Sequence, residues 1–194
     1  MKKLLSLLLA ALLCLGCMIP AMAENLTVTT EKPFTFTLDS YKAMYDMVAQ
    51  SVLQATPVWT TDEATGNVIV TTEGFSDVTV TVDENNNVTG VNTLLKATDA
   101  DLQDKANAYG MIVAVAGMSA AMLENPELGA KFADEFTPLF TSLLNGVKQA
   151  IQGETVKVVG DVAGTSCACT MSIDLTSMTY TFGFHMAPLG TVIE

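Results

Sequence analysis

The chain has 194 residues, nearly half of them apolar, and carries 21 acidic side chains against nine lysines and no arginine, for a net charge of −12. Nucleic-acid binding needs cations that displace counterions from phosphates, so this composition argues against nucleic acid and against anionic membrane surfaces as partners. Four cysteines are too few for a disulfide-rich scaffold, and the apolar content suffices for a core without disulfides.

The first 23 residues have the three parts of a cleavable secretory signal peptide of bacterial style. Lys2 and Lys3 give a positive start, residues 4–15 form an apolar run, and Ala21 and Ala23 are the small residues that signal peptidase needs at −3 and −1. We therefore expect cleavage after Ala23.

Two alternatives to cleavage remain open. An uncleaved membrane anchor would need roughly 20 apolar residues, and the run is shorter. Lipidation of Cys17 would suit the preceding Gly16, but Cys14 occupies the position where lipoprotein signals have leucine.

Cleavage would leave residues 24–194 as a single extracytoplasmic domain. The loss of two of the nine lysines leaves seven against 21 acids, a net charge of −14. We expect this product to be secreted or held in the cell envelope after passage through the general secretory route, with no transmembrane helix after cleavage.

The first half of the mature chain reads as strands around one helix. Residues 26–30 and 34–38 predict short edge strands, and a helix capped by Asp39 or Ser40 follows over 41–55. Apolar alternation predicts strands at 58–60, 68–72, 78–82 and 88–95, of which the last two form the clearest hairpin.

The period then changes to that of helices. Thr98 or Asp99 caps a helix that runs to about residue 123, and its apolar second half carries a stripe of small residues typical of a buried core helix. Asn125 and Pro126 predict the start of an antiparallel second helix, with a kink or restart at Pro138 and an end at Gly153.

The remaining residues return to strands. One strand is predicted at 155–159, and a hairpin is formed by 167–173 and 178–184 around a turn at 174–177. Segregated helices and hairpins, without a βαβ rhythm, predict an α+β fold in which about three helices cover one face of an antiparallel sheet. The order of elements also allows two loosely related halves, each a helix followed by a meander.

Ser166 and His185 are candidate site residues in this last hairpin. A symmetric turn would pair Ile173 with Met178, and counting back would then place Ser166 opposite His185 on the polar face. A Ser–His contact is the minimum for an activated hydroxyl, but the sequence offers no orienting acid, and the ordinary reading is an exposed cross-strand pair.

Trp59, Asp62 and Glu63 form a second candidate ligand-binding group. An exposed Trp59 would stack on or anchor a ligand, and two nearby carboxylates would suit a polar ligand such as a sugar. The alternative is that Trp59 belongs to the core and that the acids lie in a solvated turn.

Cys167 and Cys169 are the two cysteines that remain after cleavage. On a strand they would share a face with their Cα atoms about 6.6 Å apart, near the outer limit for a disulfide. They are candidates for a disulfide, a redox pair or half of a soft-metal site, or else they are small buried hydrophobes.

Residues 74–95 resemble the opening hairpin of exported FMN-binding domains. The resemblance would imply a flavin carried on the Thr of a Ser-Gly-Ala-Thr motif, but this chain lacks that motif, and Gly164-Thr165-Ser166 is a poor substitute for it. We therefore expect no cofactor and no metal.

The sequence predicts a non-catalytic binding or interaction module that meets a protein, a peptide or a small ligand. The alternatives are a secreted hydrolase that uses Ser166 and His185, or a flavin- or cofactor-binding envelope protein.

Overall fold

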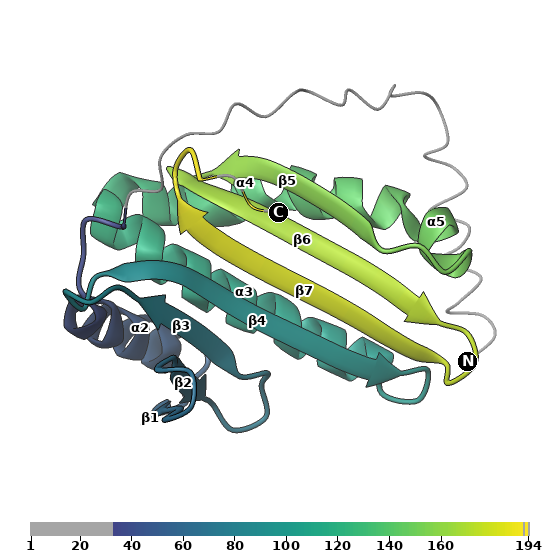
Figure 1. Cartoon of the computed structure of the whole chain (residues 1–194), viewed down its shortest axis with the longest axis horizontal. Coiled ribbons are helices and arrows are strands. Elements are labelled where there is room, and N and C mark those ends of the chain that lie inside the picture. Colours follow the sequence, from purple (N-terminus) through teal and green to yellow (C-terminus); the bar gives the residue numbers. More distant parts are fainter. Residues whose placement is uncertain (1–32, 192, 194) are drawn as a thin grey trace.

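A computed structural model describes residues 33–191 and residue 193 of the chain. The expected signal peptide and the strand predicted at 26–30 lie outside the described residues. Within them, seven strands form one antiparallel sheet in the order β1-β2-β3-β4-β7-β6-β5, and the helices lie on one face of that sheet (Figure 1). The predicted α+β fold is confirmed.

The elements follow the chain in two groups. The first group is helix α2 (Leu38–Val52) and strands β1 (Val58–Thr61), β2 (Val68–Thr71), β3 (Val78–Val82) and β4 (Val88–Thr98). The second is helices α3 (Leu102–Glu124), α4 (Pro126–Asn145) and α5 (Val147–Ile151), then strands β5 (Val156–Val162), β6 (Thr165–Asp174) and β7 (Thr179–Pro188). Each group is helical first and a meander afterwards, and the last strands of the two meanders, β4 and β7, pair at the centre of the sheet.

Helix α2 begins earlier than the sequence predicted. Thr37 is its N-cap and accepts a hydrogen bond from the Ser40 backbone N–H at 3.4 Å, so neither Asp39 nor Ser40 is the cap. The residues predicted as a strand at 34–38 form an isolated bridge, from Thr37 to Asn87, flanked by backbone hydrogen bonds to Val88 and Asn86, and then turn into the helix. Pattern alone missed this because a short apolar-Thr alternation is equally compatible with an extended lead into a capped helix.

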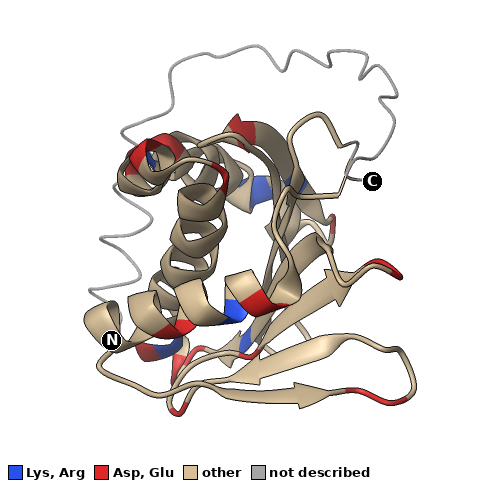
Figure 2. Cartoon of the chain, turned by 90° about the vertical axis from the view of Figure 1, so that its left-hand side faces the viewer, with Lys and Arg blue, Asp and Glu red and all other residues tan. Residues whose placement is uncertain are grey.

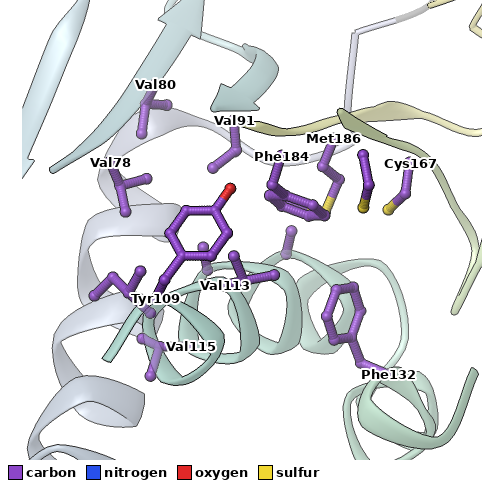
Figure 3. Packing of buried hydrophobic residues seen from close by; sticks show 14 of the residues in the cluster. Val78, Val80, Val91, Tyr109, Val113, Val115, Phe132, Cys167, Phe184 and Met186 are labelled. Carbon is purple, nitrogen blue, oxygen red and sulfur yellow. The ribbon is translucent and has the colours of Figure 1, made fainter. Parts of the chain in front are cut away.

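Helix α3 is the central helix of the layer and contacts α2, α4 and the sheet. Its length and apolar composition would let it cross a membrane, and half of its most apolar stretch is buried inside the protein. Two tyrosine hydroxyls fix its position: Tyr41 of α2 donates to the Ala116 carbonyl, and Tyr109 donates to the Thr93 carbonyl of β4, each at 3.2 Å. Figure 3 shows the Tyr109 ring lying between α3 and the strand residues Val91 and Phe184.

Helices α3 and α4 pack antiparallel, as predicted, because glycines let them approach closely. A Cβ at Gly117 would lie 1.9 Å from the tip of the buried Phe132 ring, and one at Gly129 would lie 2.0 Å from Met122. Of the kink or restart predicted at Pro138, the restart does not occur, since this residue lies inside α4. The end predicted at Gly153 is wrong for α4, whose C-cap is Gly146, where close contact with Val156 leaves no room for a side chain.

The final hairpin is two residues out of the predicted register. Ile173 pairs with Tyr180 rather than Met178, because the loop is formed by residues 175–178 and Met178 itself has a positive φ of 50°. Ser166 consequently pairs with Ala187, and His185 pairs with Ala168.

The face of the sheet opposite the helices is rich in threonine and poor in charge. In the pairing of β4, β7 and β6, the residues on this face include Asn92, Leu94, Thr181, Thr170 and Ser172. The acidic residues lie mainly on the helices and at the turns between strands (Figure 2). We call the face of the sheet opposite the helices the open face.

Candidate functional site

Strand β4 is paired with β3 on one side and with β7 on the other, and it extends beyond the end of β3. Its pairing with β3 stops at Thr93, opposite Val78, whereas its pairing with β7 continues to Thr98. Figure 1 shows β4 running past β3. From Leu94 to Thr98, therefore, one edge of β4 has no strand partner among the residues that the structure describes.

Hydrogen bonds at the end of β4 show which backbone groups point to this free edge. The Thr98 N–H donates to Asp101 Oδ1 at 2.6 Å and the Thr98 carbonyl accepts from the Asp101 N–H at 3.1 Å, while the Lys96 carbonyl accepts from Lys105 Nζ at 3.3 Å. Backbone groups of alternate residues in a strand point to the same side. Leu94 and Lys96 thus present their backbone N–H groups to the free edge.

A recess of about 370 Å³ adjoins this free edge. It is lined by Gly74, Phe75 and Ser76 from the β2–β3 connection, Leu94, Leu95 and Lys96 from β4, and Lys105 and Ala108 from α3. The volume is at the low end of the range found for small-molecule sites. The lining residues thus include one aromatic residue, two leucines, a serine and two lysines.

The two lysines of the recess differ in their electrostatic state. Lys105 forms an ion pair with Asp101 at 2.7 Å, and this contact, together with the hydrogen bonds from Thr98, lowers the pKa of Asp101 to about 2. No ion pair or hydrogen bond to the Lys96 ammonium is found in the described part of the chain. Lys96 is therefore the cation that is available to a ligand.

Trp59 is held by the helix it faces. Its indole N–H donates to Asp46 Oδ1 at 2.8 Å, and its ring meets Tyr41 and Tyr45 edge-on, with the Lys42 ammonium 5.6 Å from the ring centroid. Both the aromatic ring and the indole N–H of Trp59 therefore contact side chains of α2. These contacts favour a structural role in the core over stacking on a ligand.

Asp62 and Glu63 lie in the β1–β2 turn, and the side chain of Asp62 stabilises that turn. Its carboxylate accepts hydrogen bonds from the Thr65 hydroxyl at 2.8 Å and from the Ala64 N–H at 2.9 Å, which lower its pKa. Glu63 is exposed. No contact between these acids and Trp59 is present among the described residues.

Ser166 and His185 share the open face but do not pair with each other. The Ser166 hydroxyl donates to Asp161 at 3.1 Å and accepts from the Gly190 N–H at 3.0 Å. His185 Nδ1 is hydrogen-bonded to the side-chain oxygen of Asn92. The imidazole is not a partner of the hydroxyl, so the geometry that a Ser–His hydrolase requires is not formed here.

Cys167 and Cys169 are free, buried thiols on the core face of β6. Figure 3 shows Cys167 beside Met186, within the apolar core. Burial raises the pKa of both thiols to about 12, so almost no thiolate exists near neutral pH. The two cysteines are thus packed in the core as small apolar side chains. Among the described residues, no group of three potential metal ligands occurs.

The residues around the free edge of β4 were missed by sequence reasoning. Lys96, Lys105 and Phe75 are scattered over three elements and share no motif. One signal was present, because the predicted strand at 88–95 is longer than its hairpin partner at 78–82. Unequal hairpin partners leave part of the longer strand without a neighbour.

No family model, curated protein or solved structure matches this chain. The site must therefore be interpreted from its own geometry.

Proposed function

We propose that the chain is an exported, non-catalytic binding protein whose ligand occupies the recess beside the free edge of β4. The single observation that supports this most is the coincidence of three features there: a strand edge with no strand partner among the described residues, an open recess of about 370 Å³, and a Lys96 ammonium with no partner in that same part of the chain. Each of the candidate residues Trp59, Asp62, Ser166 and His185 is already bonded to other parts of the chain.

Export is tested by the mass of the protein made from the full chain in a bacterial host. The expected product outside the cytoplasm begins at Glu24, and Ala23→Phe should block its release because the side chain at −1 must be small. A product that retains all 194 residues, or that carries a lipid on Cys17, would contradict cleavage at this site.

Binding is tested on the exported protein by a thermal-shift screen with short peptides, sugars, flavins and divalent cations. A ligand that binds only the folded protein raises its melting temperature by mass action. The rise in melting temperature caused by such a ligand should be lost in Ala108→Leu, because the larger side chain fills the recess from α3. It should be retained in Ala130→Leu, the same substitution at an exposed position of α4. A hit that survives Ala108→Leu but disappears in Trp59→Phe would move the site to Trp59.

A further inference from the structure

The free edge of β4 differs from the two ordinary edges of the sheet. Strands β1 and β5 end the sheet on either side, whereas the free part of β4 lies inside it, next to an open recess bordered by the β2–β3 connection and α3. A chain added here would find backbone partners on β4 and a cavity for one of its side chains. Recognition of peptides by strand addition uses this combination of backbone bonds and side-chain pockets.

The side chains of β4 define what an added strand must carry. Leu94 and Lys96 lie on the open face, opposite Gly183 and Thr181 of β7, and Leu94 is 54% exposed. Leu95 points to the other side, where it is 4% exposed and lines the recess. Residues of an added strand alternate in the same way, so those opposite Leu94 and Lys96 would share the open face and the one between them would enter the recess.

The side chains of Leu94, Leu95 and Lys96 indicate which types of residue the added strand should carry opposite them. Opposite charges that face each other across neighbouring strands attract, so the residue beside Lys96 should be acidic. The residue beside the exposed Leu94 should be apolar, and so should the one that meets Phe75 and Ala108 in the recess. The Lys96 ammonium has no partner in the described part of the chain, and the acidic side chain would supply one.

We infer that this protein binds an extended peptide segment, which joins β4 as an antiparallel strand with the order acidic–apolar–apolar opposite Lys96, Leu95 and Leu94. The inference rests on the proposed function and specifies its ligand. The peptide N–H groups opposite Leu94 and Lys96 donate to the β4 carbonyls, and the Lys105 ammonium gives up or shares the Lys96 carbonyl that it now contacts at 3.3 Å.

The probe is the end-blocked peptide acetyl-Thr-Glu-Val-Val-Thr-amide, whose only charge is the glutamate. Added to the isotope-labelled exported protein, it should shift the NMR signals of the Leu94 and Lys96 amides. Replacing its Glu by Gln should weaken binding about two- to fivefold, as expected for one exposed cross-strand charge pair. Lys96→Gln should remove this difference, and Lys131→Gln on the exposed face of α4 should leave it unchanged.

Two methylated peptides test strand addition itself. An N-methyl group on the second valine removes the donor aimed at Leu94 and should abolish binding, whereas one on the first valine points away from β4 and should be tolerated. Equal binding of both methylated peptides, with shifts confined to residues 74–76 and Ala108, would overturn strand addition and leave the proposed site standing.

The absence of any shift overturns the inference in a different way. If the peptide leaves these signals unmoved and Lys96→Thr makes the protein self-associate, Lys96 serves to protect an exposed edge, as lysines on edge strands do. If no ligand from the screen moves the recess signals either, the proposed function falls together with the inference.

Discussion

Individual side chains in this protein are occupied mainly by their own neighbours. The two thiols are buried, the Trp59 indole is hydrogen-bonded to Asp46, and the His185 imidazole is hydrogen-bonded to Asn92. The pKa changes of the titratable side chains follow mainly from burial or from local hydrogen bonds. Two predictions belong to this scale.

The first concerns Cys167 and Cys169. Because burial raises the pKa of both thiols to about 12, the folded protein should react very slowly with a thiol reagent such as Ellman's reagent at pH 7.5. In 6 M guanidinium chloride both thiols of a protein made as residues 24–194 should react at once. Rapid reaction of the native protein would contradict the buried environment, and no reaction after unfolding would show a disulfide.

The second concerns His185, whose pKa is lowered first by burial and then by the charge of Lys157. A histidine with a lowered pKa binds fewer protons in the folded state than in the unfolded state. The free energy of unfolding should therefore be at its full value above about pH 6.5 and should fall as the pH drops below it.

His185→Gln tests this assignment, because glutamine does not titrate. Urea unfolding of the parent and the variant between pH 5 and 7.5 should show a smaller loss of stability with acid in the variant. Parallel curves would mean that another group is responsible.

The helices and strands are determined largely by residues close together in the sequence, whereas the recess beside β4 is formed by segments that are far apart in it. The β3–β4 turn shows this well: Asp83 accepts hydrogen bonds from the Asn85 and Asn87 N–H groups, and Asn86 adopts a positive φ of 64°, which asparagine tolerates. Such chemistry is contained in a few consecutive residues, and so the hairpin could be predicted from the sequence.

Contacts between distant segments account for what could not be predicted. Pro138 stays inside α4 because packing of that helix on α3 and the sheet outweighs a lost hydrogen bond. The register of the last hairpin depends on the conformation of Met178, which pattern alone does not specify. The recess is lined by β4, α3 and the β2–β3 connection, three segments that only the fold brings together.

Helix α3 provides a prediction at the scale of the element. Gly117→Ala would place a methyl group 1.9 Å from the buried Phe132 ring, and we expect a loss of about 1–3 kcal/mol of stability from overpacking. Gly110→Ala, in the same helix with open space around it, should gain about 0.5–1 kcal/mol because alanine is the better helix former. Urea unfolding of both variants measures the contrast, and similar values for the two would contradict close packing of α3 on α4.

At the scale of the whole molecule, charge is the dominant feature. Residues 24–194 carry seven lysines against 21 acids. The one ion pair found among the described residues joins Lys105 to Asp101. Repulsion among the remaining carboxylates destabilises the compact state, and salt screens repulsion between exposed charges.

We therefore expect 0.5 M sodium chloride to raise the melting temperature at pH 7. The same addition near pH 4.3, the isoelectric point of the sequence, should have a smaller effect, because fewer carboxylates are charged there. A lower melting temperature in salt at pH 7 would show that attractive pairs outweigh the repulsion.

The order of the strands also governs when the protein can fold. Strand β7 comes last in the chain among the described strands, yet it lies inside the sheet and joins β4 to β6. The contact between Asn92 and His185 spans 93 positions of the chain, and contacts of such long range slow folding. Without β7 the polypeptide lacks the strand that connects its two meanders, so the two halves of the sheet can join only after β7 has paired with both β4 and β6.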